Sequence, residues 1–90
     1  MTEVLRLKRN PDVSWRTIEG QAVLIHNRLG EIQVLNDLGT FVWENFDLGP
    51  AALARNIADR HEVTPEEAER DVLDFIRALR ESGALTDVDG

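Results

Sequence analysis

The side chains that carry most enzyme chemistry are few in this 90-residue chain. The chain has no cysteine, which excludes thiol catalysis, disulfide bonds and cysteine-ligated metal centres. Its two histidines, His26 and His61, lie 35 residues apart and do not form a pair with metal-ligand spacing. Its two serines, Ser14 and Ser82, do not occur in the strand-turn-helix motif of a nucleophile. The sequence therefore favours a protein that is not an enzyme and that uses no metal or cofactor.

Carboxylates are the abundant chemical group, with 17 acidic and 10 basic side chains and a net charge of −7. The surplus of acidic over basic side chains lies in the second half of the chain. Residues 47–90 carry eleven acidic and five basic side chains, whereas residues 1–46 carry six and five. This balance argues against nucleic-acid binding, which needs a basic face. The densest acidic cluster, at residues 66–74, is either a solvated helix face or a rim that selects a basic partner.

Residues 13–18 and 31–35 alternate with the period of two that is typical of β-strands, and residues 21–26 form a run rich in residues that favour strands. Three strands are expected at 13–18, 21–26 and 31–35, and the short turns between them predict an antiparallel meander. A meander of this size needs a helix layer on one face to be stable. Residues 1–12 are expected to form an irregular lead-in.

The period changes to that of a helix at Asn36, which is a good N-cap. Three helices are expected, at residues 36–46, 50–61 and 64–82. Gly83 is well placed to end the third of them.

Residues 84–86 are expected to return as a short strand, and residues 87–90 to form a polar tail. The chain as a whole, residues 1–90, is expected to be one α+β domain in which three helices cover one face of a three-stranded antiparallel sheet. No apolar run approaches the ~20 residues that span a membrane. The N-terminus also lacks the apolar segment of a signal peptide, so we expect a cytoplasmic protein with no membrane partner.

The third helix should bury one apolar stripe, made of Ala68, Val72, Phe75 and Leu79. Leu73 and Ile76 lie beside that stripe, so the apolar arc is wider than a surface helix needs. The third strand has the same property: Ile32 and Val34 point to one face while Leu35 points to the other. These extra apolar side chains either complete the core or flank a strand edge to which a peptide strand can be added. Both tryptophans, Trp15 and Trp43, are expected in the core.

The chain resembles the PqqD-like proteins, small domains also called RiPP precursor-peptide recognition elements. The resemblance covers residues 11–85 and depends on a combination of short fragments in order. These fragments are Pro11–Arg16, Glu19–Leu24, Leu35–Gly39, Val42–Glu44, Leu53-Ala54, Ile57-Ala58, Val63, Asp71–Leu73, Phe75-Ile76, Leu79 and Ser82–Leu85. Residues 27–30 and the Trp15-Arg16 pair are more similar to the stand-alone recognition proteins of lasso-peptide pathways.

The resemblance implies a winged helix-turn-helix-like domain that binds the leader region of a ribosomally made precursor peptide. The leader would add as a strand beside the third strand and pack against the third helix, without catalysis by this chain. The bound peptide would then be presented to a modifying enzyme, such as a leader peptidase or a radical-SAM enzyme. By position, the peptide-binding residues would be Ile32, Gln33, Val34 and Leu35 on the strand, and Asp71, Leu73, Phe75, Ile76 and Arg80 on the helix. The resemblance leaves open which flank of that helix faces the peptide.

Two other functions compete with peptide recognition. A DNA-binding winged helix is suggested by fold analogy alone, and the acidic helical half argues against it. An adaptor or homodimer would use the same strand edge to pair with a second copy of the chain.

Overall fold

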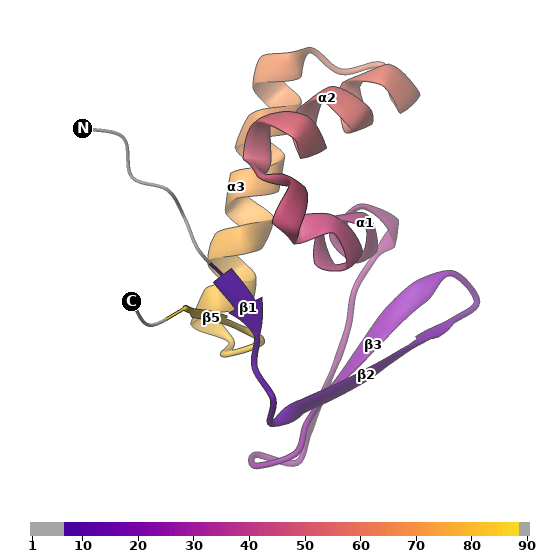
Figure 1. Cartoon of the computed structure of the whole chain (residues 1–90). Coiled ribbons are helices and arrows are strands. Elements are labelled where there is room, and N and C mark those ends of the chain that lie inside the picture. Colours follow the sequence, from indigo (N-terminus) through magenta and orange to yellow (C-terminus); the bar gives the residue numbers. More distant parts are fainter. Residues whose placement is uncertain (1–6, 89–90) are drawn as a thin grey trace.

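The computed structural model describes residues 7–88, which form a three-stranded antiparallel meander followed by three helices (Figure 1). The predicted α+β fold class is confirmed. The strands are β1 (Leu7–Arg9), β2 (Val13–Ile18), β3 (Gln21–His26), β4 (Glu31–Val34) and β5 (Leu85–Asp87). The helices are α1 (Asp37–Asn45), the 3-10 turn η1 (Phe46–Leu48), α2 (Pro50–Arg60) and α3 (Pro65–Glu81).

The meander has the strand order β2-β3-β4, so β3 is central and β4 lies at an edge. Its first turn is formed by Glu19 and Gly20, which have φ angles of 51° and 82°. Two consecutive positive φ angles give the turn a twist that matches the right-handed twist of the flanking strands. The second turn ends at Gly30, with a φ of 70°, and leads directly into β4.

The helix ends follow the capping residues that the sequence suggested. The side chain of Asn36 accepts a hydrogen bond from the Gly39 N–H at 2.7 Å, and Thr64 accepts one from the Glu67 N–H at 3.1 Å. Each bond satisfies an N–H group that has no partner inside its helix. At the other end of α3, Gly83 has a φ of 86°, the left-handed conformation that commonly ends a helix.

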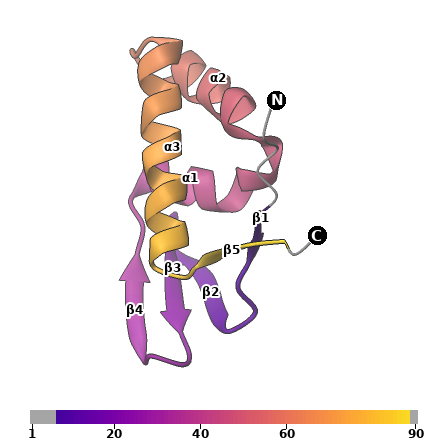
Figure 2. The ribbon, with the colours of Figure 1, turned by 90° about the vertical axis from the view of Figure 1, so that its left-hand side faces the viewer.

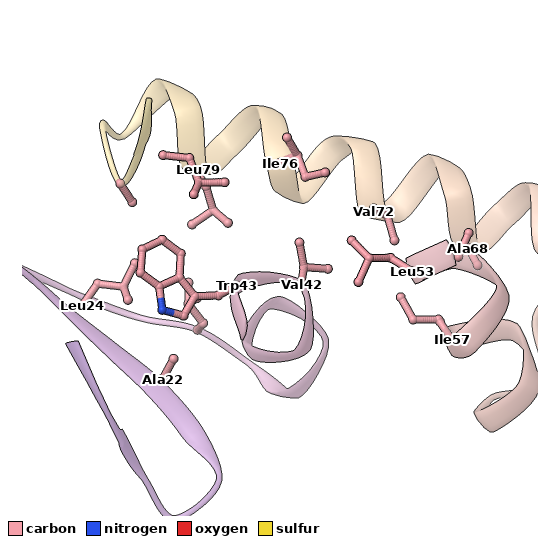
Figure 3. Close-up of a cluster of buried hydrophobic side chains, with 14 of the residues drawn as sticks. Ala22, Leu24, Val42, Trp43, Leu53, Ile57, Ala68, Val72, Ile76 and Leu79 are labelled. Carbon is pink, nitrogen blue, oxygen red and sulfur yellow. The ribbon is translucent and has the colours of Figure 1, made fainter. Parts of the chain in front are cut away.

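The core extends from the inner face of the meander to the interface of α2 with α3, where Leu53 and Ile57 meet Val72 (Figure 3). Trp43 of α1 is fully buried between Leu24 of the sheet and Leu79 of α3 (Figure 3). One part of the predicted stripe on α3 was wrong: Ile76 is only 4% exposed and joins the core, whereas Phe75 is half-buried. Both residues border the apolar arc of the helix, and the packing of α2, α3 and the strands decides which of them is enclosed.

The expectation of an irregular lead-in was wrong for its described part, because Leu7–Arg9 forms β1 and pairs antiparallel with β5. Asp87, expected in the polar tail, is the last residue of β5. Asn10 fixes this pairing: its N–H donates to the Ala84 carbonyl at 2.9 Å, and its side-chain amide donates to the Gly83 carbonyl at 2.9 Å. Three-residue strands show no periodicity, so only the folded chain brings them together. The rest of the predicted lead-in and tail, residues 1–6 and 89–90, lies outside the described residues.

The expectation that Trp15 lies in the core was also wrong, since Trp15 is 37% exposed and not part of the core. Its ring meets that of Trp43 edge-on, with centroids 5.8 Å apart. The Arg9 guanidinium lies 4.8 Å from the Trp15 ring centroid and 5.0 Å from that of Trp43. It also donates a hydrogen bond to the Trp43 carbonyl at 2.8 Å. Arg9 therefore attaches β1 to both α1 and the meander.

Candidate functional site

The outer edge of β4 is the most distinctive feature of the described chain, since β3 is the only described strand that pairs with β4. The Leu35 N–H donates to the Ala22 carbonyl of β3 at 2.9 Å. Bonding direction alternates along an antiparallel strand, so Gln33 also faces β3 while Ile32 and Val34 face away from it. Two N–H and two C=O groups are therefore directed toward the open edge.

The side chains of β4 divide between the two faces of the sheet. Ile32 and Val34 are 68% and 60% exposed on the face away from the helices. On the helix side, Leu35 is buried, and the Gln33 side-chain oxygen lies 3.0 Å from the His26 ring nitrogen. Of the four strand residues suggested by sequence, Ile32 and Val34 thus present the free backbone groups, and Leu35 supports the strand from the core.

One flank of α3 lies beside β4 (Figure 2). Phe75 packs on Gly39, just past the end of β4: a Cβ built on Gly39 would lie 2.8 Å from the Phe75 ring. At the other end of the strand, Ser82 lines a small cavity together with residues 26–29, the turn that leads into β4. Phe75 and Ser82 lie two helical turns apart on one helix face, and Asp71 and Ala78 belong to the same face. We call the open edge of β4 and this flank the edge site.

The remaining predicted helix residues lie elsewhere. Arg80 pairs with Asp87 of β5, with 2.9 Å between the guanidinium and carboxylate atoms. Leu73 lies on the same side of the helix as Arg80, opposite the flank with Phe75. Ile76 is in the core, where it lines a cavity with Leu7 of β1. Of the five helix residues suggested by sequence, the structure brings Asp71 and Phe75 to the junction of β4 and α1, where Phe75 lies against Gly39 and Asp71 lines a cavity with Asn36.

A cavity of about 600 Å³ adjoins the edge site where β4 passes into α1. Leu38 and Phe41 of α1, Ile57 of α2 and Val63 form its apolar lining. Its polar lining residues are Gln21, Asn36, Asp37, Arg60, His61 and Asp71, which include both acidic and basic side chains. The cavity can therefore hold a bulky apolar group against its apolar lining, with polar side chains beside it.

Sequence reasoning missed this cavity and the contribution of Ala78 and Ser82. The spacing of residues 71, 75, 78 and 82 marks a single helix face, which could have been compared with the alternative face at 73 and 80. The cavity has no comparable signal, because its lining comes from β3, three helices and the segments between them.

The site has the properties of a binding surface for an extended chain. It offers main-chain donors and acceptors in a row, an aromatic ring at Phe75 and a carboxylate at Asp71. Within residues 7–88, no three His, Asp or Glu side chains are grouped as metal ligands. The helices of the described part are also too short or too polar to cross a membrane.

Comparison with known proteins agrees with this geometry. A family model described as "Coenzyme PQQ synthesis protein D (PqqD)" matches residues 21–85. One similar solved structure is described as "TbiB1 in Complex with the TbiA(beta) Leader Peptide". It has 26% sequence identity and a TM-score of 0.80, over 92% of this chain and 99% of that chain.

A second is described as "Lasso peptide synthetase B1 complexed with the leader peptide". It has 29% identity and a TM-score of 0.81, over 90% of this chain and 98% of that chain. No curated protein matches the chain. Both similar structures are thus complexes with a leader peptide.

Proposed function

The chain belongs to the PqqD family, and on that premise we propose that it binds the leader region of a ribosomally synthesised precursor peptide by strand addition to β4. The observation that carries the proposal is the open edge of β4 beside the flank of α3 with Phe75. The similarity to two structures that contain leader peptides supports it. Main-chain hydrogen bonds at such an edge give affinity that depends little on sequence, and side-chain contacts add selectivity.

The edge site also suggests how the peptide is selected. Successive side chains of an added strand alternate between the two faces of the sheet. Those on the helix side would meet Phe75 and Ala78, whereas those on the other side would lie beside Ile32 and Val34. One peptide residue beyond the strand would reach the cavity lined by Leu38 and Phe41, which suits a bulky apolar side chain.

We further propose that this chain presents the bound peptide to an enzyme of a lasso-peptide pathway, such as a leader peptidase, and does not itself catalyse the reaction. The edge site holds the peptide through its main chain, which leaves residues outside the added strand available to an enzyme. A flexible leader loses conformational entropy when it becomes ordered, so moderate affinity and release of the product are expected.

The direct test is to titrate this protein into a fluorescently labelled leader peptide, taken from the precursor encoded beside its gene, and to measure anisotropy. Saturable binding of the leader, with no binding of the labelled core peptide, supports the proposal. A labelled DNA duplex at low salt is the control for the competing nucleic-acid function. Absence of leader binding by a protein shown to be folded would contradict the proposal.

A further inference from the structure

The cavity beside the edge site is larger than one peptide side chain needs. Its volume is about 600 Å³, within the range of about 300–1,000 Å³ that holds whole small-molecule ligands. A cavity of this volume is about 10 Å across, which is the length of about three residues of extended peptide. It therefore has room for an apolar residue and for the neighbour on each side of it.

The end of the cavity nearest the edge site is acidic. Asp37 is the first residue of α1 and follows Val34, the last residue of β4, by three positions. Asp71 extends from the same flank of α3 as Phe75, and both carboxylates line the cavity. Neither makes an ion pair with a basic side chain of residues 7–88. A peptide that leaves the β4 edge for the cavity therefore passes two carboxylates from different helices.

The opposite end of the cavity is basic. Arg60 and His61 line it at the C-terminal end of α2, a helix that α1 separates from the meander (Figures 1 and 2). The Arg60 guanidinium lies 5.3 Å from the centroid of the Phe41 ring, a distance at which the ring attracts a cation. Arg60 makes no ion pair with any carboxylate of the described chain, Asp37 and Asp71 included. The guanidinium is thus held against the apolar lining and is available to a ligand.

The depth of these groups matches the geometry of an extended peptide. Leu38 and Phe41 are partly buried and form the floor of the cavity, whereas Asp71 and Arg60 are exposed at its rim. Successive side chains of an extended chain point in opposite directions. A peptide residue that points to the floor therefore has two neighbours that point to the rim, one toward each charged end.

We propose that the cavity selects a leader segment in which an apolar residue lies between two oppositely charged residues. The lysine or arginine nearer the added strand pairs with Asp71 and Asp37, and the aspartate or glutamate beyond the apolar residue pairs with Arg60. This inference rests on the strand addition proposed above and names the class of peptide that the same site takes. A leader with the reverse order of charges would place like charges together at both ends, so the arrangement fixes the register as well as the partner.

The test exchanges charges between the protein and the leader. Asp71→Lys and Arg60→Glu each reverse one end of the cavity, and the labelled leader encoded beside this gene is made with each of its charged residues reversed singly. Asp74→Lys and Arg55→Glu are the matched controls, because each is exposed on the same helix as its test residue and does not line the cavity. Circular dichroism and thermal unfolding establish that every variant is folded, and anisotropy gives the affinities.

We expect Asp71→Lys and Arg60→Glu each to weaken leader binding about fivefold or more, because reversal replaces an attraction by a repulsion, and the controls to change it less than about twofold. Reversal of one basic leader residue should restore binding to Asp71→Lys, and reversal of one acidic leader residue should restore binding to Arg60→Glu. These two leader residues should flank a single apolar residue.

Three results would overturn the inference: equal losses in the test and control variants, losses that no leader reversal restores, or restoring residues that do not flank one apolar residue. A leader that binds but contains no such triplet of residues would also overturn it. Failure of the unchanged protein to bind leader is a separate result and contradicts the proposed function itself.

Discussion

Replacement of Val34 by proline tests the edge site at one backbone atom. The Val34 N–H is directed away from β3, because Leu35 donates to Ala22 and the bonding direction alternates along the strand. Proline removes that N–H but takes no hydrogen bond from the meander, and proline is tolerated at an edge position whose N–H faces solvent. Val34→Pro should therefore remain folded and lose a donor to the peptide.

The size of the effect follows from the group left without a partner. In the proposed complex, the peptide carbonyl that accepts from Val34 would lie between two strands and would have no replacement donor. An unsatisfied buried acceptor costs about 1–3 kcal/mol, which corresponds to a Kd raised about 5- to 150-fold. The unfolding free energy should change much less, because Val34 is exposed and its N–H points away from β3, the one strand among residues 7–88 that pairs with β4.

The assay is an anisotropy titration of labelled leader with Val34→Pro and with the control Val34→Thr. Threonine keeps the backbone N–H and the branched side chain, so its affinity should stay close to that of the unchanged protein. Urea unfolding of both variants establishes that the fold is retained. If folded Val34→Pro binds leader with unchanged affinity, then strand addition at this position is wrong, whatever else the protein binds.

Three further substitutions test how the fold supports the site. Thr40→Val should lower the unfolding free energy, measured in urea, by about 1–3 kcal/mol. The buried Thr40 hydroxyl accepts from the Ala22 N–H at 2.9 Å, and valine would leave that donor unpaired. An unchanged urea midpoint of unfolding would show that this N–H has another partner. Gly39→Ala should be destabilising by about 1 kcal/mol, although alanine is the better helix former, because the added Cβ displaces the Phe75 ring. The same displacement should weaken leader binding, and anisotropy would contradict it if the affinity were retained. Arg9→Lys should lower the free energy of unfolding by about 1–2 kcal/mol, measured by heat or urea, since lysine lacks the planar group that lies against both tryptophans. Equal stability would show that charge alone holds β1 in place.

Local patterns placed the meander and the helices correctly, because each was specified by neighbouring residues. Alternating side chains and the Glu19-Gly20 turn defined the first two strands. Asn36 and Thr64 defined helix starts through bonds to N–H groups three residues further along the chain. The extra apolar side chains of the third strand suggested an open strand edge as one of two readings, and the structure has such an edge at β4.

Tertiary packing decided the rest. The β1–β5 pair joins three-residue strands from opposite ends of the chain; a strand was expected at residues 84–86, but β1 and its pairing with β5 left no pattern in the sequence. Helix α3 has an apolar arc wide enough to bury either Phe75 or Ile76, and the position of the other helices and the sheet selects Ile76. That choice leaves Phe75 on the β4 side and turns Leu73 and Arg80 away from it.

The sequence by itself determined the three strands of the meander, the three helices and their order, because turns, caps and periodicity act over a few residues. It also determined the acidic charge of the helical half and the absence of cysteine chemistry. Only the tertiary structure decided which groups meet at the edge site and that a cavity adjoins it. It also decided that Asp71 and Arg60, from different helices, line that cavity together. These features depend on contacts between residues far apart in the chain, which packing of the whole core sets at once.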